Sequence, residues 1–419
     1  MALIYLLLFI APQVLVFLYL RERLPTVARP ERAAWVRRGL AAVFLLFNFP
    51  WIFFARRILF GTVWGQGGVP LIGPWVAWQM MGWVFCGLVA VYLVGKALVW
   101  IWGRAVRRTG GQAVTESDRP TAGPPVRPLS RRQFLARATY AYGAAGAAIG
   151  GYGIWNADRL PEVTRRTLWF PHLPAGLDGI RILHLSDVHA GAYMEREKME
   201  RLVAQANALA PDLILQTGDL IDISRDYIPE YVKAFRELRA PLGVVTCLGN
   251  HDHYTGADAV ERGARDAGQT VLRIGTHVVE RDRTPLALVA VDDPQDWEFD
   301  DPQTADVDDA LRGAPPETFK ILLAHRPGAW DAAAPRDVPL TLSGHIHGGQ
   351  FYLPVVGWSA GRLITKYVMG HFQRGDSQLY VSRGIGVVGV PIRIFVPPEI
   401  ALLELKRSDG QEPPPSRES

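Results

Sequence analysis

Cysteine is almost absent from this sequence of 419 residues, in which Cys86 and Cys247 are the only two. Cys86 lies in an apolar run and Cys247 in a predicted strand, so no disulfide framework is expected. Acidic residues are scarce in residues 1–157, which hold 17 Lys and Arg but only four Asp and Glu. This part carries +13, so residues 158–419 carry −9 in a chain of +4. Because the basic charge lies outside the globular part, we expect no nucleic-acid partner.

Long apolar segments distinguish the first part of the chain. Four stretches lack charge over lengths that can cross a hydrocarbon core of about 30 Å. They are Met1–Leu20, Gly39–Ala55, a stretch centred on Trp75–Val94, and Ala138–Ala157. They predict a transmembrane region of about four helices in residues 1–157, with a Pro- and Gly-rich linker at 109–128.

Arginines between these segments predict the orientation. The loops Arg21–Arg38 and Gly103–Arg137 hold six and eight arginines, and short Arg-rich loops stay in the cytoplasm. The large domain that follows should therefore lie on the outer face of the cytoplasmic (inner) membrane of a multi-pass protein. The run Ser130–Leu135 resembles a twin-arginine export signal. Alternatively, its arginines simply precede a span, and in both interpretations the domain lies outside.

Residues 165–406 alternate short β-rich runs with amphipathic helical stretches, which predicts an α/β layered domain. The predicted helices are Glu195–Leu209, Pro229–Arg239 and Ala257–Ala267. The predicted strands are Ile180–Leu185, Leu213–Gln216, Gly243–Leu248, Val271–Ile274, Leu286–Val291, Ile321–Ala324, Leu340–Leu342, Leu379–Val381, Ile392–Phe395 and Ile400–Leu405. Residues 407–419 are predicted to form a disordered tail.

Five predicted strands are followed by side chains that can bind metal. The groups, in chain order, are Asp187 with His189, Asp219 with Asp222, Asn250 with His251 and Asp252, His325, and His345 with His347. Ligands at the carboxyl ends of strands can converge in one crevice. The other histidines, which are His172, His184, His253, His277 and His371, are expected to be ordinary polar groups.

The ordered motifs D-x-H, GD-x-x-D, GNHD, a lone His and GHIHGG resemble the calcineurin-like metallophosphoesterase superfamily, over about Thr167 to Leu405. This resemblance implies a four-layer αββα sandwich and a metal-dependent phosphoric ester hydrolase. The run GHIHGGQ and the late runs Ser382–Gly386 and Pro391–Arg393 are similar to a subgroup of membrane-associated bacterial phosphodiesterases. That subgroup includes twin-arginine-exported members and relatives that cleave UDP-2,3-diacylglucosamine.

The same resemblance implies a dinuclear centre with two divalent ions. Asp187, His189 and His347 would hold the first ion, Asn250, His325 and His345 the second, and Asp219 would bridge them. Mixed N and O ligands without thiolate suit Mn, Fe, Zn or Ni. A metal-activated water would attack phosphorus. His251 would protonate the leaving oxygen or stabilise the transition state, and Asp222 would orient His251. Asp252 would share that orienting task or, as we favour, cap a helix.

Three functions remain open. We favour hydrolysis of a phosphodiester or pyrophosphate at the membrane, with a lipid-linked or envelope-related substrate and membrane lipids as partners. The second is UDP-2,3-diacylglucosamine cleavage in lipid A synthesis, which needs a site facing the cytoplasm. The third is a membrane receptor or transporter whose phosphoesterase-like domain only binds. No acidic residue occurs in the apolar segments, which argues against the third.

Overall fold

The computed structural model describes residues 145, 146, 148–293 and 299–408, and isolated helical positions between Val14 and Leu45. Most of the four predicted membrane segments, the linker at 109–128, the motif Ser130–Leu135 and the end of the tail therefore lie outside the described residues. Within the described residues, none of the helices combines the length and apolar character that crossing a bilayer requires. The chain divides into two compact units, and the second, which begins its main part at Tyr152, contains the elements below.

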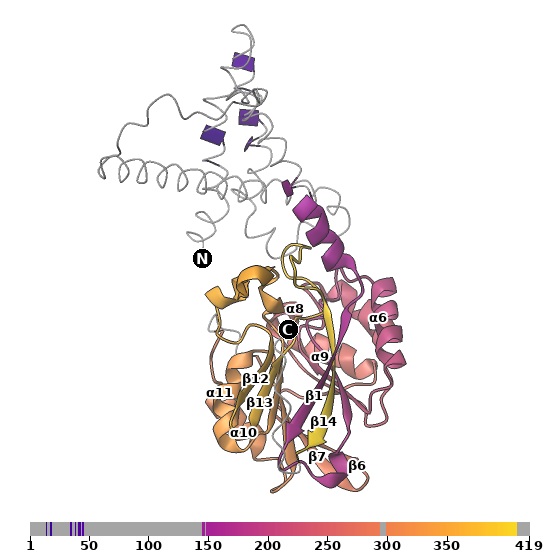
Figure 1. Ribbon diagram of the computed structural model, residues 1–419. Helices are drawn as coiled ribbons and strands as arrows, with labels where there is room; N and C mark the ends of the chain where they lie inside the picture. The colour runs from indigo at the N-terminus through magenta and orange to yellow at the C-terminus, as the bar shows by residue number, and fades with distance from the viewer. Residues whose placement is uncertain are drawn as a thin grey trace, which may run out of the picture. The chain divides into compact units, whose positions relative to one another are not determined.

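Two six-stranded sheets form the centre of this unit (Figure 1). The first has the order β1 (Glu162–Phe170), β14 (Glu399–Arg407), β2 (Arg181–Leu185), β3 (Leu213–Thr217), β4 (Val244–Cys247) and β5 (Thr270–Val271). The second has the order β12 (Gly370–Arg374), β13 (Ser377–Val381), β9 (Leu340–Ser343), β8 (Phe319–Leu323), β7 (Thr284–Ala290) and β6 (Gly275–Arg281). Strands β2 to β5 run parallel, as do β13, β9, β8 and β7. The carboxyl ends of the parallel strands in each sheet therefore meet at one edge.

Alternating side chains divide the core into layers, because successive residues of a strand point to opposite faces. In β3, Ile214 packs with the helices, whereas Leu213 and Leu215 pack between the two sheets. Helices α6 (Arg196–Ala208), α7 (Ile228–Phe235) and α9 (Ala257–Asp266) cover the first sheet. Helices α10 (Thr304–Leu311) and α11 (Trp330–Ala333) cover the second. The architecture is the expected αββα sandwich.

Most predicted elements are present, but the predicted strand Ile392–Phe395 is wrong. These residues form a loop in which only Ile394 makes an isolated bridge, with Phe351, and Phe395 has a φ of 53°. Only Val271 of the predicted strand Val271–Ile274 lies in a strand. Strands β1, β6 and β12 were not predicted, because they lie at sheet edges and their half-buried sequences lack a clear apolar alternation.

Helix α7 ends four residues before the predicted end at Arg239. Asn207 explains the early end, because its side chain donates to the carbonyl of Glu237 (2.7 Å) and accepts from the amide of Arg239 (2.9 Å). These bonds draw the chain away from the helix. Helices α6 and α9 match their predictions closely.

Residues 152–158 are helical and pack on the same unit. The carbonyl of Gly153 accepts from the amide of Arg393 (3.0 Å), and Asn156 Nδ2 donates to the carbonyl of Arg393 (2.9 Å). Asn156 is fully buried. The last residues of the predicted segment Ala138–Ala157 are thus docked onto the globular unit.

Candidate metal centre

The carboxyl ends of five parallel strands bring together the side chains that the sequence singles out. Asp187 and His189 follow β2, and Asp219 follows β3. Asn250 begins α8 (Asn250–Thr255) after β4. His325 follows β8, and His345 and His347 follow β9. Convergence at this edge occurs because parallel strands end on the same side of a sheet.

A first group of donors surrounds His347. Its Nε2 lies 3.1 Å from Nε2 of His189 and 3.3 Å from Oδ1 of Asp187. All three side chains are buried and could hold one metal ion. The separations fit this role, because two ligand atoms bound at about 2.0–2.2 Å to one cation stand about 3.0–3.5 Å apart.

A second group of donors surrounds His325. Its Nε2 lies 3.1 Å from Oδ1 of Asn250 and 3.0 Å from Nδ1 of His345. Asp219 lies in both groups, since its Oδ2 is 3.2 Å from Nε2 of His325 and 3.5 Å from Nε2 of His189. One carboxylate oxygen thus faces both sets of donors. This donor set, with its shared carboxylate and no thiolate, fits divalent cations.

The backbone at these positions is locally strained. Five donor residues have positive φ angles, which residues other than glycine rarely adopt. They are Asp187 (54°), His189 (49°), Asp219 (52°), His345 (70°) and His347 (53°). Such strain persists only where the surrounding structure enforces it, and it concentrates at functional sites. Neighbouring glycine is required at one turn, because a Cβ on Gly344 would collide with Ser186 Oγ and Asp187 Oδ2.

Burial and opposite charges set the protonation of the donors. Burial opposes ionisation of Asp219, but His325 and His251 outweigh burial and hold the pKa of Asp219 well below its usual value. Burial lowers the pKa of His347 to about 4, although Asp187 opposes the shift. His347 is therefore a neutral donor at physiological pH. Burial lowers the pKa of His325 as well, but Asp219 outweighs burial and raises this pKa to about 10, so metal binding there must release a proton.

His251 lies beside the donors and is bound to Asp222. Its Nδ1 is 2.9 Å from the carbonyl oxygen and 3.1 Å from Oδ1 of Asp222, while its amide donates to Oδ1 of Asp219 (2.9 Å). Burial lowers the pKa of His251, but the charge of Asp219 and the bond to Asp222 outweigh burial and raise it to about 9. His251 can therefore carry a proton at neutral pH.

Comparison with known proteins assigns the chain to a family. The sequence profile described as calcineurin-like phosphoesterase matches residues 180–349. An uncharacterized metallophosphoesterase of Bacillus subtilis, YkuE, is 34% identical over 293 residues, which cover 67% of this chain and 99% of that protein. The chain belongs to the calcineurin-like phosphoesterase family.

Two further relatives extend this match. A protein of Danio rerio described as a transmembrane protein with metallophosphoesterase domain is 31% identical over 62% of this chain and 61% of its own length. An uncharacterized metallophosphoesterase of Aquifex aeolicus is 31% identical over 58% of this chain and 92% of its own length. The chain is a metal-dependent phosphoester hydrolase, and its family uses divalent metals.

The carboxylate of Asp252 accepts hydrogen bonds from two backbone amides and so has a structural role. Its Oδ2 accepts from the amide of Gly249 (2.9 Å) and its Oδ1 from the amide of Ile221 (3.0 Å). The first bond caps α8, as the favoured sequence interpretation expected. Burial and the charge of Asp219 raise the pKa of Asp252 to about 7.

Sequence reasoning gave Arg393 no role, but in the structure this residue lies beside the metal centre. Arg393 is fully buried, and its Nη2 lies 3.1 Å from Nδ1 of His347. It also donates to the carbonyls of Arg383 (2.8 Å), Gly384 (3.1 Å) and Gly386. A single arginine between two isoleucines in an apolar stretch was the available signal, because a lone buried charge needs partners.

The remaining histidines have other surroundings. Nε2 of His184 lies 2.8 Å from Thr217 Oγ1, and Nε2 of His253 lies 2.7 Å from Asp292 Oδ1. His371 bonds Gln378 (2.8 Å), His172 is exposed, and His277 lies in β6. None of them belongs to the donor groups of the described residues.

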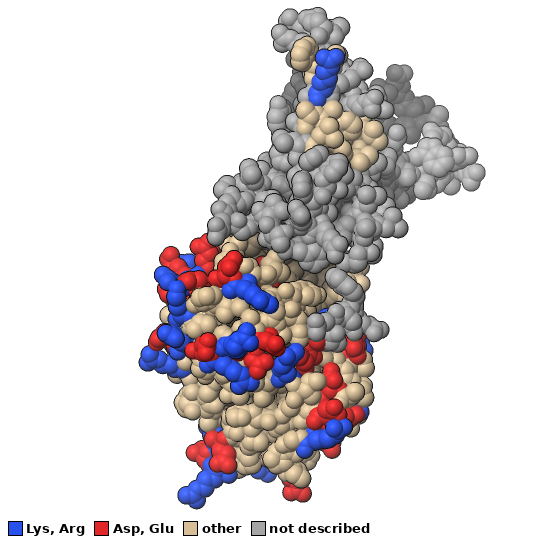
Figure 2. Space-filling view, turned by 180° about the vertical axis from the view of Figure 1, so that it is seen from behind, with Lys and Arg blue, Asp and Glu red and all other residues tan. Residues whose placement is uncertain are grey.

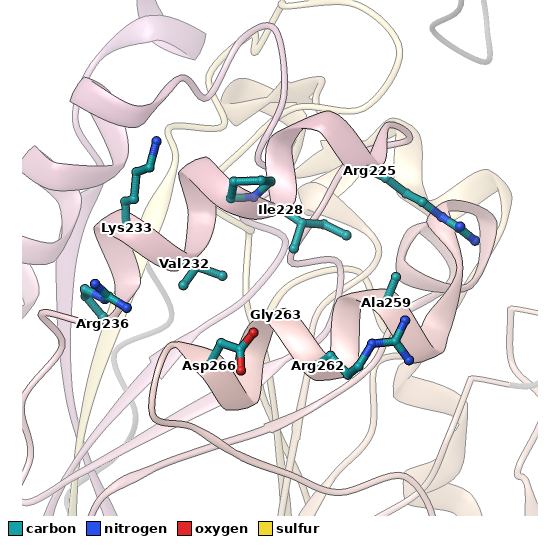
Figure 3. A pocket seen from close by; sticks show the side chains of 10 residues that line it. Arg225, Ile228, Val232, Lys233, Arg236, Ala259, Arg262, Gly263 and Asp266 are labelled. Atoms are coloured by element: carbon teal, nitrogen blue, oxygen red, sulfur yellow. The ribbon is translucent and has the colours of Figure 1, made fainter.

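A separate groove lies between α7 and α9 (Figure 3). The residues that line it include four cations, Arg225, Lys233, Arg236 and Arg262, and one acid, Asp266. No donor of the metal centre lines it. On the face of the molecule in Figure 2, basic and acidic side chains of the described residues are interspersed, and no large basic patch of the kind that binds nucleic acid is present there.

Proposed function

We propose that the chain hydrolyses a phosphodiester or pyrophosphate at a dinuclear centre. Asp187, His189 and His347 would hold one divalent ion, Asn250, His325 and His345 would hold the other, and Asp219 would be shared between them. The observation that supports this best is the position of Asp219 Oδ2, which is within 3.5 Å of His189 and 3.2 Å of His325. A shared carboxylate offsets the repulsion between two cations held about 3.5–4 Å apart.

When bound, the cations supply an activated water and offset the charge that develops on the phosphoryl oxygens. His251 donates the proton that the leaving oxygen requires. Asp222 fixes His251 through Nδ1, which leaves Nε2 for the substrate. The amide of His251 holds Oδ1 of Asp219, so that Oδ2 keeps its orientation towards both histidines.

The membrane part of the proposal concerns the substrate. We place the chain in the cytoplasmic membrane as a multi-pass protein, with the hydrolase domain on the outer face and a lipid-linked or envelope-related phosphate ester as substrate. Support comes from the uncharged segments and Arg-rich loops of residues 1–157 and from the description of the Danio rerio relative as a transmembrane protein. Similarity to the twin-arginine-exported subgroup is part of this proposal. UDP-2,3-diacylglucosamine is the alternative substrate and requires the opposite orientation.

The test is metal-dependent turnover of a generic aryl phosphodiester by the purified full chain. We expect chelation to abolish turnover and divalent Mn, Fe, Zn or Ni to restore it. Asp219→Asn should lower both metal content and turnover, and His251→Ala should lower turnover at normal metal content. His277→Ala, on β6, is the matched control and should match the parent.

Two results would count against the proposal. If a variant with both Asp219→Asn and His251→Ala keeps its turnover, the proposed mechanism is wrong. A chain that binds metal but hydrolyses no lipid, nucleotide or aryl diester would instead favour a receptor or transporter with a binding domain.

A further inference from the structure

A small insert forms part of the rim of the metal centre. It occupies residues 350–369, between η9 (His347–Gly349) and β12, and contains β10 (Tyr352–Leu353), η10 (Pro354–Val356), β11 (Trp358–Ser359) and η11 (Ala360–Leu363). Ser359 Oγ donates to the carbonyl of Gly348 (2.6 Å), and the backbone of Gly361 packs directly on Gly349. The insert is therefore fixed to the turn that carries His347.

Large apolar side chains of this insert face solvent. Val355 is 97% exposed, Leu363 73% and Val356 69%. Leu353 and Ile364 are also exposed, as is Phe395 in the adjacent loop. Single exposed apolar residues are common on proteins, but several within one segment of twelve residues, Leu353–Ile364, favour a contact surface. We call Leu353, Val355, Val356, Leu363, Ile364 and Phe395 the apolar rim.

The charge around the apolar rim favours one kind of partner. The insert contains no acidic residue, and its only charged residues are Arg362 and Lys366, whereas residues 158–419 carry −9 overall. Arg362 is exposed, and Lys366 pairs with Asp331 (2.8 Å). Apolar side chains next to basic ones are the composition that binds the surface of an anionic bilayer.

The apolar rim is continuous with the end of a predicted membrane segment. The amide of Tyr352 donates to the carbonyl of Ile394 (2.9 Å), which joins the insert to the loop that contains Phe395. The Phe395 ring packs on the Tyr152 ring, with centroids 5.2 Å apart. Tyr152 lies within the apolar stretch Ala138–Ala157, and Trp155 on the same stretch is exposed. If this stretch enters a bilayer, the apolar rim lies at that bilayer's surface.

We propose that the apolar rim rests in the interface of an anionic lipid bilayer and holds the metal centre at head-group level. The inference deepens the proposed function, on which it rests, by assigning residues that present the centre to lipid-borne phosphate esters. Figure 1 shows the insert, in orange, at the same end of the sandwich as α8, whereas the β6–β7 turn lies at the other end. The domain would therefore stand upright on the membrane.

The test uses the full chain reconstituted in vesicles of phosphatidylglycerol and phosphatidylethanolamine that contain nitroxide-labelled lipid. A fluorophore is attached at Val355→Cys or Leu363→Cys, and at Arg283→Cys as the matched control. Arg283 is exposed in the β6–β7 turn. The parent chain supplies the background from Cys86 and Cys247. We expect the two rim labels to be quenched several-fold more than the control label.

Equal quenching at the rim and at Arg283→Cys would overturn the proposal. The rim labels could instead become inaccessible only as the chain concentration rises. That result would also overturn the proposal, because it identifies a second copy of the chain as the occupant of the apolar rim. Quenching needs no turnover, so Asp219→Asn should give the same result. Failure of the docking surface is thereby separated from failure of the hydrolase mechanism.

Discussion

The alkaline pH dependence of hydrolysis should arise from the ionisation of His251. A general acid must hold its proton, so kcat should fall as pH rises through the pKa of His251. In the metal-free site, burial lowers this pKa, but Asp219 and Asp222 outweigh burial and raise it to about 9. Bound cations offset the charge of Asp219, so the decline should begin at a lower pH than in the metal-free site. We expect His251→Gln to lower kcat by about 10²–10⁴-fold and to remove this alkaline decline. The measurement is a profile of kcat against pH with saturating metal.

A conservative change at its partner provides the control for this prediction. Asp222→Asn keeps an oxygen near Nδ1 of His251 but removes the negative charge that raises the pKa of His251. The alkaline decline should therefore begin at a lower pH. An unchanged profile in both variants would show that His251 does not supply the proton.

Variants of Asp252 and Asp222 distinguish a carboxylate with a structural role from one with a role in the mechanism. Asp252→Ala leaves the buried amides of Gly249 and Ile221 without their partner, so we expect it to lower the free energy of unfolding by about 1–2 kcal/mol. Its effect on kcat should be smaller than that of Asp222→Ala. Thermal unfolding and kcat are measured on the same samples. A larger loss of kcat in Asp252→Ala would assign the orienting role to Asp252 instead.

At the scale of elements, the loop between β13 and β14 supports the first donor group. The amide of Ile385 donates to the carbonyl of Ser186 (3.0 Å), and the amide of Gly386 donates to the carbonyl of Asp187 (2.7 Å). Arg393 holds the loop from inside by donating to its carbonyls. The loop thereby links the donors after β2 to residues 152–158, which bond the backbone of Arg393.

Removing the Arg393 guanidinium should therefore affect stability and metal binding together. Arg393→Ala leaves several buried carbonyls unpaired, and we expect a loss of about 3 kcal/mol or more. Arg336→Ala is the control, because its pair with Asp308 is reached by solvent and should contribute little to stability. Thermal unfolding and metal content are the measurements. An Arg393→Ala chain as stable as Arg336→Ala would contradict this account.

At the scale of the whole molecule, the distribution of arginines predicts which side of the membrane the hydrolase faces. A reporter that is active only outside the cytoplasm should be active after Ser419. A reporter that is active only in the cytoplasm should be active after Arg127. The reverse result at Ser419 would place the metal centre in the cytoplasm and favour UDP-2,3-diacylglucosamine as substrate.

The sequence by itself determined the buried parallel strands and the donors that follow them. Continuous apolar runs such as Leu213–Leu215 predict buried strands, and polar groups that follow such strands are expected at the sheet edge. The parallel strands that carry the donors could therefore be predicted. The amphipathic helices α6 and α9 could be predicted for the same local reason.

Only the tertiary structure decided how distant segments meet. Strands β1 and β14 pair from opposite ends of the domain, and Asp219 Oδ2 lies between His189 and His325. The buried bonds of Arg393 and the exposure of Val355 likewise depend on packing partners far away in the sequence. Local patterns specify which face of an element is apolar, but contacts between elements depend on the complete fold.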